Sequence, residues 1–393
     1  MMRNTTVGID VGTHQIKVVV AELVKENGKS TTHVVGTGFS ESKGLRHGYI
    51  INKEDAIESI RTAVRSAEKS SGIKINRAFI SVGGIGLLGT ASTGSIIIGR
   101  ADLQITELDI EKLGEICEKN LPPNILQNHK ILHSIPVSYK IDGKSILTKS
   151  PLDLKGTKLE VKMLFVTCLE PHLNDLMEAV DESRIEVVDV IASPIASSFV
   201  TLTKAQKTAG CILANIGAET TSLVVFENNI PISLEIFPIG STDITNDIAL
   251  GLKIPLEEAE NVKVGSIGTN SFPKKKLDEI ISARLSDMFE LIENHLKRVG
   301  RNGLLPAGIF IIGGGANIGG IEDFAKMSLK LPSRIPPLNL IDTKNKMKDS
   351  TWAVSYGLCT LAFSTSERID LGLKSRFSKI IEKIFGSLKQ FLP

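Results

Sequence analysis

Residues 210–227 read GCILANIGAETTSLVVFE, and residues 7–22 read VGIDVGTHQIKVVVAE. A shift of 205 positions superposes equivalent residues of the two stretches: Asp10 on Asn215, Gly12 on Gly217, and Glu22 on Glu227. In each stretch an apolar run leads into a turn with glycine and then into a second apolar run, which predicts a β-hairpin. The repeat therefore predicts two duplicated halves, the second of which carries an amide where the first carries an acid.

The glycine turns of the two hairpins can bind an anion. Glycine permits positive φ at the tip, so that successive backbone N–H groups converge on one point. Nearby hydroxyl groups can join them: those of Thr13, Thr220, Thr221 and Ser222. A plain hairpin turn is the alternative for either copy taken alone. Two copies 205 residues apart favour two halves that clamp a polyphosphate between them.

A third glycine cluster points to a nucleoside. Residues 309–320 read IFIIGGGANIGG, and the three successive glycines between a strand and a helix let a flat ligand approach the backbone. A tight strand–helix crossover is the alternative. Two further signals are PIGSTDIT over 238–245 and the helix LEEAENVKVG, whose charged residues share one face: Glu257, Glu260 and Lys263. That face can hydrogen-bond a ribose and a base edge, or it can be a solvated row of ion pairs.

Bulk composition narrows the class of protein. A length of 393 residues predicts at least two subdomains, and a net charge of +2 gives no argument for a nucleic-acid partner. The four cysteines are scattered without a Cys-x-x-Cys pair, which argues against a zinc site or a disulfide framework and fits a reducing cytosol. The first 30 residues lack a signal-peptide pattern, and no apolar run reaches the roughly 18 residues of a spanning helix. Any membrane contact is expected to be peripheral.

Residues 83–165 are predicted to form an inserted small α/β module. The stretch 83–100 is rich in Gly, Ser and Thr with short β runs, and 105–121 has helical spacing with Thr106 as its cap. The strand-like runs HKILHSIPVSYKID and LEVKMLFVTCLE follow.

The end of the chain, residues 374–393, reads KSRFSKIIEKIFGSLKQFLP and predicts an amphipathic helix. The apolar residues share one helical face: Phe377, Ile380, Ile381, Ile384, Phe385, Leu388, Phe391 and Leu392. The other face carries four lysines and an arginine against the single acid Glu382. A basic, apolar-faced helix suits the interface of an anionic bilayer. The alternative is a helix that packs on the body of the protein itself.

The order of these segments resembles the FtsA family of bacterial cell-division proteins, within the actin-like ATPase superfamily. The matching motifs span nearly the whole chain: GIDVGTHQIKVVV, SVGG with STGSI, ILHSIPVSYKID, PLDLKGTKLEV, PIGSTDITNDIALGL, EEAENVK and IIGGGANIGGIEDFA. The resemblance implies an α/β fold, the actin-like duplicated two-domain ATPase fold, with an inserted 1C-type module and a C-terminal amphipathic helix. It divides the chain into subdomain IA over 1–82, the inserted module over 83–165, IA again over 166–200, IIA over 201–240, IIB over 241–305, IIA again over 306–344, a closing helix of IA over 345–365, a linker over 366–373 and the membrane-targeting helix over 374–393.

The resemblance also implies ATP and Mg²⁺ in the central cleft. Asp10 would lie near the metal and bind it through water. The first phosphate loop would contain Gly12, Thr13, His14 and Lys17, and the second Gly217, Thr220 and Thr221. The nucleoside side would be lined by Gly240, Ser241, Glu257, Glu260, Lys263, Gly313, Gly314, Gly315 and Ala316.

Asn215 departs from the family, which has aspartate at this catalytic position. A neutral amide can neither balance the charge of Mg²⁺ nor accept a proton as a base, although Glu219 brings a charge back nearby. We therefore expect ATP binding with weak or absent ATPase activity. The alternative is that Asn215 caps the turn and Asp10 alone serves the metal.

The implied function is an ATP-binding adaptor on the cytoplasmic face of the membrane at the division septum. It would assemble into filaments through 83–165 and hold the C-terminal peptide of FtsZ on 241–305, besides contacting other division proteins. The basic residues Lys297, Arg298 and Arg301 are a candidate surface for that peptide, or alternatively a solvated helix end.

Two other functions remain open. A pilus-assembly ATP-binding protein of the same fold would bind a peptide of an inner-membrane partner, but that relative generally lacks the terminal amphipathic helix. A sugar or acid kinase would need a carboxylate base facing a second substrate, and we find no such motif.

Overall fold

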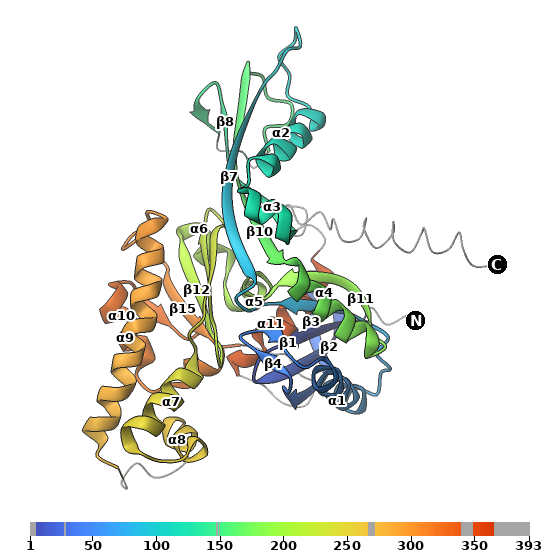
Figure 1. Cartoon of the computed structure of the whole chain (residues 1–393). Helices are drawn as coiled ribbons and strands as arrows, with labels where there is room; N and C mark the ends of the chain where they lie inside the picture. Colours follow the sequence, from blue (N-terminus) through green and yellow to red (C-terminus); the bar gives the residue numbers. More distant parts are fainter. Residues whose placement is uncertain are drawn as a thin grey trace, which may run out of the picture.

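The computed structural model describes residues 5–26, 29–146, 148, 150–265, 272–338 and 349–364. Two five-stranded sheets of the same topology form its body (Figure 1). The first has the order β3-β2-β1-β6-β11 and the second β14-β13-β12-β15-β16. In each sheet the first three strands along the chain are antiparallel, and the last two run parallel to the first.

The first half contains these elements: β1 (Thr5–Val11), β2 (Gln15–Glu26), β3 (Lys29–Glu41), β4 (Leu45–Arg46), β5 (Tyr49–Ile50), α1 (Lys53–Ser71), β6 (Arg77–Val82), α4 (Glu170–Glu182), β11 (Glu186–Ala192) and α5 (Ser193–Thr201). Helix α1 is capped at its start by Asn52, whose side chain accepts a hydrogen bond from the Asp55 N–H, and at its end by Gly72 in the left-handed region. Its buried face follows the helical period and covers the sheet.

The second half contains these elements: α6 (Lys204–Ala209), β12 (Cys211–Ile216), β13 (Thr221–Glu227), β14 (Ile230–Phe237), α7 (Ser241–Leu252), α8 (Leu256–Lys263), α9 (Lys274–Arg298), β15 (Gly308–Ile312), η2 (Gly314–Asn317), α10 (Ile321–Leu329) and β16 (Ser333–Arg334). Both predicted hairpins form, and they share one register. Val11 pairs with Ile16 at the first tip, as Ile216 pairs with Thr221 at the second.

The two halves share a buried core around η3 (Ser350–Trp352) and α11 (Ala353–Phe363). Trp352 and Tyr356 pack there with Val19 of the first sheet and with Phe226 of the second. The halves are therefore joined along one side by apolar packing.

A smaller antiparallel sheet with two helices forms the inserted module, whose base packs on β14 and whose far end projects beyond the two large sheets (Figure 1). Its elements are β7 (Leu87–Ile97), α2 (Glu107–Lys119), α3 (Pro123–Asn128), β8 (His129–Ile141), β9 (Lys144–Ser145) and β10 (Lys158–Leu169). The stretch 83–100 differs from the expected short β runs, because β7 is one continuous strand. Gly89 shows why the stretch is rich in small residues: a Cβ there would lie 2.6 Å from the Leu234 carbonyl oxygen of β14.

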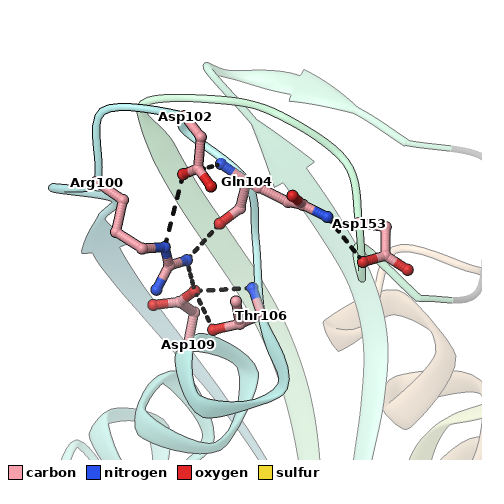
Figure 2. A network of polar contacts seen from close by, with 6 residues as sticks. All are labelled: Arg100, Asp102, Gln104, Thr106, Asp109 and Asp153. Carbon is pink, nitrogen blue, oxygen red and sulfur yellow. Dashed lines mark hydrogen bonds and ion pairs between the residues drawn. The ribbon is translucent and has the colours of Figure 1, made fainter.

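A polar network fixes the loop between β7 and α2 (Figure 2). The Arg100 guanidinium contacts the Asp109 carboxylate and the Gln104 carbonyl oxygen. Asp109 also accepts hydrogen bonds from the N–H and hydroxyl of Thr106, at 2.8 and 2.7 Å. Burial raises the pKa of Asp109, but Arg100 and Thr106 outweigh it and hold that pKa at about 2. Thr106 is the N-cap residue of α2, as expected, and the Asp109 carboxylate accepts from its backbone N–H.

Candidate functional site

The two hairpin tips line one cavity of about 560 Å³ between the halves. The predicted site residues that line it are Asp10, Gly12, Thr13, His14, Lys17, Asn215, Gly217, Thr220, Ser241, Glu260, Lys263, Gly313 and Gly314. The predicted residues that are not part of this lining are Thr221, Gly240, Glu257, Gly315 and Ala316.

The wall formed by the first hairpin carries two opposite charges. Asp10 and Lys17 are opposite one another in the register of β1 and β2. The Ser81 hydroxyl donates a hydrogen bond of 2.7 Å to the Asp10 carboxylate. Burial raises the pKa of Asp10 and lowers that of Lys17, and the attraction between the two groups opposes both shifts without cancelling them. An ionised Asp10 therefore gains from any further cation in the cavity.

The wall formed by the second hairpin is neutral. Asn215 pairs in register with Ser222, whose hydroxyl is buried and has no hydrogen-bond partner among the described residues. The Thr221 hydroxyl instead donates to the Ile239 carbonyl oxygen at 2.8 Å. Thr221 thus serves the packing behind the wall.

Glycine lets helix α7 approach the tip of the second hairpin. The N–H groups of Ser241 and Thr242 donate to the carbonyl oxygens of Gly217 and Ala218, at 2.9 and 2.8 Å. A Cβ at Gly240 would lie 2.3 Å from the Ala218 carbonyl oxygen. Gly240 therefore supports the site from outside the cavity.

Glu219, at the tip of the second hairpin, is hydrogen-bonded to the first half. Its carboxylate accepts a hydrogen bond of 2.5 Å from the backbone N–H of His47. It is not part of the cavity lining. The charge that Glu219 supplies is therefore not presented to a ligand in the place of an aspartate at position 215.

On the side expected to bind a nucleoside, Lys263 is the central polar group. Its ammonium donates to the Thr245 hydroxyl at 2.8 Å and to the Ser241 carbonyl oxygen at 3.2 Å, and it pairs with Glu260 at 2.6 Å. The Lys263 side chain is only 6% exposed, whereas that of Glu260 is 49% exposed. Burial raises the pKa of Glu260, but hydrogen bonds from Lys263 and Thr245 outweigh it and lower that pKa. Glu260 therefore offers an ionised carboxylate to the cavity.

The turn after β15 brings backbone against the second hairpin. Gly313 has a φ of +86°, and a Cβ there would lie 2.3 Å from Asn215 Oδ1. A Cβ at Gly315 would lie 2.3 Å from the Ile216 side chain. Gly313 and Gly314 face the cavity, while Gly315 and Ala316 pack behind them.

Several lining residues were not predicted from the sequence: Ser193, Asn246, Leu256, Ile318, Asp349, Ser350 and Thr351. Asp349 is also among the acids that oppose the lowering of the Lys17 pKa. The segment 349–351 reaches the cavity because the following Trp352 is anchored in the core shared by the halves. No motif in its sequence signals that position.

The predicted partner residues Lys297, Arg298 and Arg301 each pair with a carboxylate of the same chain. The pairs are Lys297 with Glu293 at 3.0 Å, Arg298 with Glu235 at 2.6 Å, and Arg301 with Glu227 at 2.7 Å. These cations are therefore engaged within the second half. The predicted membrane-facing residues of 374–393 lie outside the described residues. Within the described part of the chain, no helix is long and apolar enough to cross a membrane.

Sequence comparisons identify relatives of the chain. A family profile described as "Cell division protein FtsA" matches residues 212–357, and one described as "SHS2 domain inserted in FTSA" matches residues 86–167. The chain is 30% identical over 414 residues to the cell division protein FtsA of Borreliella burgdorferi, and the match covers 98% of each chain. It is 28% identical to the cell division protein FtsA of Bacillus subtilis, over 91% of this chain and 83% of that relative.

Solved structures share the fold. The PilM–PilN type IV pilus biogenesis complex matches with a TM-score of 0.68 and 16% identity, over 91% of this chain and 98% of that one. MreB5 of Spiroplasma citri bound to ADP matches with a TM-score of 0.53 and 13% identity, over 93% and 98%. At these identities the similarity concerns the fold alone.

Proposed function

The chain belongs to the FtsA family of cell-division proteins, and from this premise we propose that it binds ATP between its halves and links FtsZ filaments to the membrane. The predicted duplicated α/β actin-like fold with an inserted module is confirmed. One observation carries the proposed ATP site: the glycine tips of two hairpins in the same register line one cavity.

The hairpin tips fit a polyphosphate. A Cβ at Gly12 would lie 2.7 Å from the Gln15 carbonyl oxygen, so a side chain at this tip would displace the backbone. Thr13 and Thr220 line the cavity beside the two tips, and the buried Ser222 hydroxyl adds an unused donor. Hydroxyl groups are donors that phosphate oxygens accept from. The positive φ expected at the tips is absent from Gly12 and Gly217, and the Gly217 N–H donates within the hairpin to the Thr220 carbonyl oxygen at 2.9 Å.

Magnesium would be held mainly through water and phosphate oxygens. The described residues hold no cluster of three or more His, Cys, Asp or Glu side chains that could bind a metal. A single carboxylate such as Asp10 suits Mg²⁺, which keeps several waters and takes ligands from substrate phosphates. The hydrogen bond from Ser81 would orient that carboxylate. When bound, the ion would neutralise phosphate charge.

The nucleoside would lie against Lys263 and Glu260, which can hydrogen-bond ribose hydroxyls. The flat backbone of Gly313 and Gly314 would face the base. Hydrolysis would be slow, because the neutral Asn215 and Ser222 offer no carboxylate to orient or deprotonate an attacking water. Nucleotide would therefore act mainly as a ligand that holds the two halves together.

The cellular part of the proposal follows the family. ATP-bound chains would assemble into filaments through the inserted module and lie peripherally on the cytoplasmic face of an anionic membrane at the septum. The residues 374–393 would provide the membrane contact. The proposal also includes the subdomain boundaries that are expected from the sequence. An acidic C-terminal peptide of FtsZ at Lys297, Arg298 and Arg301 would have to displace the three carboxylates that now pair with them.

Calorimetric titration of the full chain with ATP and Mg²⁺ tests the proposed site. Replacing the half-buried Lys17 by methionine should weaken binding about tenfold or more, because a charge-assisted contact to phosphate is lost. The matched control is Lys69→Met, at an exposed position in the last turn of α1. Equal affinities of the two variants would contradict the proposed site.

A further inference from the structure

The turn between β4 and β5, in the first half of the molecule, contacts the second half. The His47 backbone N–H donates a hydrogen bond of 2.5 Å to the Glu219 carboxylate, and His47 Nδ1 lies 3.2 Å from the Glu219 carbonyl oxygen. The two residues are 172 positions apart, and Glu219 is at the tip of the second hairpin. A displacement of that tip would therefore act directly on the turn between β4 and β5.

The same turn contacts the tip of the first hairpin. The Gly48 backbone N–H donates to the Thr13 hydroxyl at 3.1 Å, and both residues line the cavity. A hydroxyl can accept this bond and still donate its own proton to a phosphate oxygen. The N–H groups of two consecutive residues therefore bind the two hairpins: that of His47 binds the second hairpin at Glu219, and that of Gly48 binds the first at Thr13.

The turn also holds the segment that enters the inserted module. The Ile85 N–H donates to the His47 carbonyl oxygen at 3.2 Å. A Cβ at Gly48 would lie 2.5 Å from the Cα of Gly84, so the two backbones are in direct contact. Residues 83–86 lead directly into β7.

The segment that leaves the module is held by the next residue. The Tyr49 ring lies 4.5 Å from the His172 ring, centroid to centroid. His172 is in α4, which directly follows β10, and its Nε2 lies 3.0 Å from the Gly83 carbonyl oxygen. Both connections between the module and the first half therefore pack against residues 47–49.

We propose that residues 47–49 couple nucleotide occupancy to the orientation of the inserted module. The inference rests on the proposed function, because it assumes a polyphosphate between the hairpin tips. A bound polyphosphate would fix the separation of Thr13 and Glu219. The turn bonded to both would follow, and it would carry residues 83–86 and the Tyr49–His172 contact with it. Such coupling requires that nucleotide bind one orientation of the module more tightly than another.

The experiment is a distance measurement between two spin labels on the full chain, with and without ATP and Mg²⁺. The labels are attached at Ser145→Cys, exposed on β9 of the module, and at Ser66→Cys, exposed on α1 of the first half. The four native cysteines are buried, so the labels go to the two introduced thiols. Calorimetry on the same labelled protein reports whether ATP is bound.

Three variants of the labelled chain separate coupling from binding. Glu219→Ala removes the acceptor for His47 and should retain less than about half of the ATP-induced shift while binding ATP within about threefold of the parent. Glu219→Gln keeps an amide oxygen as acceptor and should retain most of the shift. Glu290→Ala removes an exposed carboxylate of α9 in the same half and should leave the shift intact.

The outcomes distinguish this inference from the proposed function. A reduced shift in Glu219→Ala with ATP bound supports the coupling. If ATP binds but produces no shift in the parent chain, or an equal shift in Glu219→Ala, the coupling is wrong and the nucleotide site stands. If ATP does not bind the parent chain, the proposed function fails and this inference fails with it.

Discussion

Asn215 and Ser222 are cross-strand neighbours in the second hairpin, at the positions that Asp10 and Lys17 occupy in the first. The first pair supplies a carboxylate and an ammonium, and the second supplies an amide and a hydroxyl. The substitution of both members keeps each wall of the cavity electrically balanced. It also removes from one wall the groups that could act on water.

Restoring the acid at position 215 should restore hydrolysis. We expect Asn215→Asp to raise the rate of phosphate release from ATP by about 100-fold or more, because one well-placed electrostatic group typically contributes on that order. The assay is steady-state phosphate release by the purified chain. Asn228→Asp, in the turn after β13, is the matched control and should leave the rate unchanged. An unaltered rate in Asn215→Asp would count against the assigned role of Asn215.

Gly313 should tolerate no side chain. Its φ is +86°, and only 2.3 Å would separate a Cβ at this position from Asn215 Oδ1. We therefore expect Gly313→Ala to destabilise the fold by about 1–3 kcal/mol. Gly319→Ala is the control, since a Cβ there meets nothing within 4 Å and its φ lies outside the left-handed region. Thermal unfolding of both variants checks the prediction, and equal melting temperatures would show that the turn has room for a side chain.

The duplicated hairpins could be predicted from the sequence because the pattern that sets a hairpin is local. An apolar run on either side of a short glycine turn indicates a hairpin, and the same pattern surrounds the tips at Val11 and Ile216. Whether a residue of the turn faces the cavity or packs behind it depends on segments distant in the sequence. Thr221 and Gly240 were expected in the cavity and lie behind its wall, since β14 and α7 approach there.

The remaining differences arise from contacts between distant segments. Glu219 reaches His47 of the other half, and the sequence contains no signal for that pair. The Gly-rich start of the inserted module was expected to be broken into short runs. Small residues in β7 instead permit close approach to Leu234, and pairing with β10 keeps the strand continuous. Tertiary packing decides both features.

His133 should make stability depend on pH below neutrality. It is fully buried at the junction of β8 with β11, accepts a hydrogen bond from the Ala192 N–H at 3.1 Å, and has its pKa lowered by burial to about 3. In the unfolded chain His133 binds a proton near the ordinary pKa of about 6.5. Above that pH its titration therefore takes nothing from the free energy of unfolding. As the pH falls from about 6.5 to about 3, the free energy of unfolding falls by up to about 1.4 kcal/mol for each pH unit.

Replacing His133 by glutamine removes this titration and keeps an acceptor for Ala192. The melting temperature of His133→Gln should therefore drop less than that of the parent between about pH 7.5 and about pH 5.5. His33→Gln, at a partly exposed position in β3, should keep the parental slope. Parallel slopes for His133→Gln and the parent would rule out a buried neutral histidine.

The residues 374–393 should be necessary for membrane binding. The full chain is expected to co-sediment with vesicles that contain anionic lipid, and a chain ending at Asp370 is expected to stay in solution. Adding FtsZ and ATP should carry FtsZ into the pellet only with the full chain. Neutral vesicles are the control for the basic face. Equal pelleting of both chains would show that residues 374–393 are not the membrane anchor.

A crystal structure with a non-hydrolysable ATP analogue and Mg²⁺ tests the central claim most directly. We predict the triphosphate between the Gly12–Thr13 tip and the Gly217–Thr220 tip, with the ribose against Glu260 and Lys263. A cavity that stays empty at saturating analogue, or an analogue bound elsewhere on the chain, would contradict the claim.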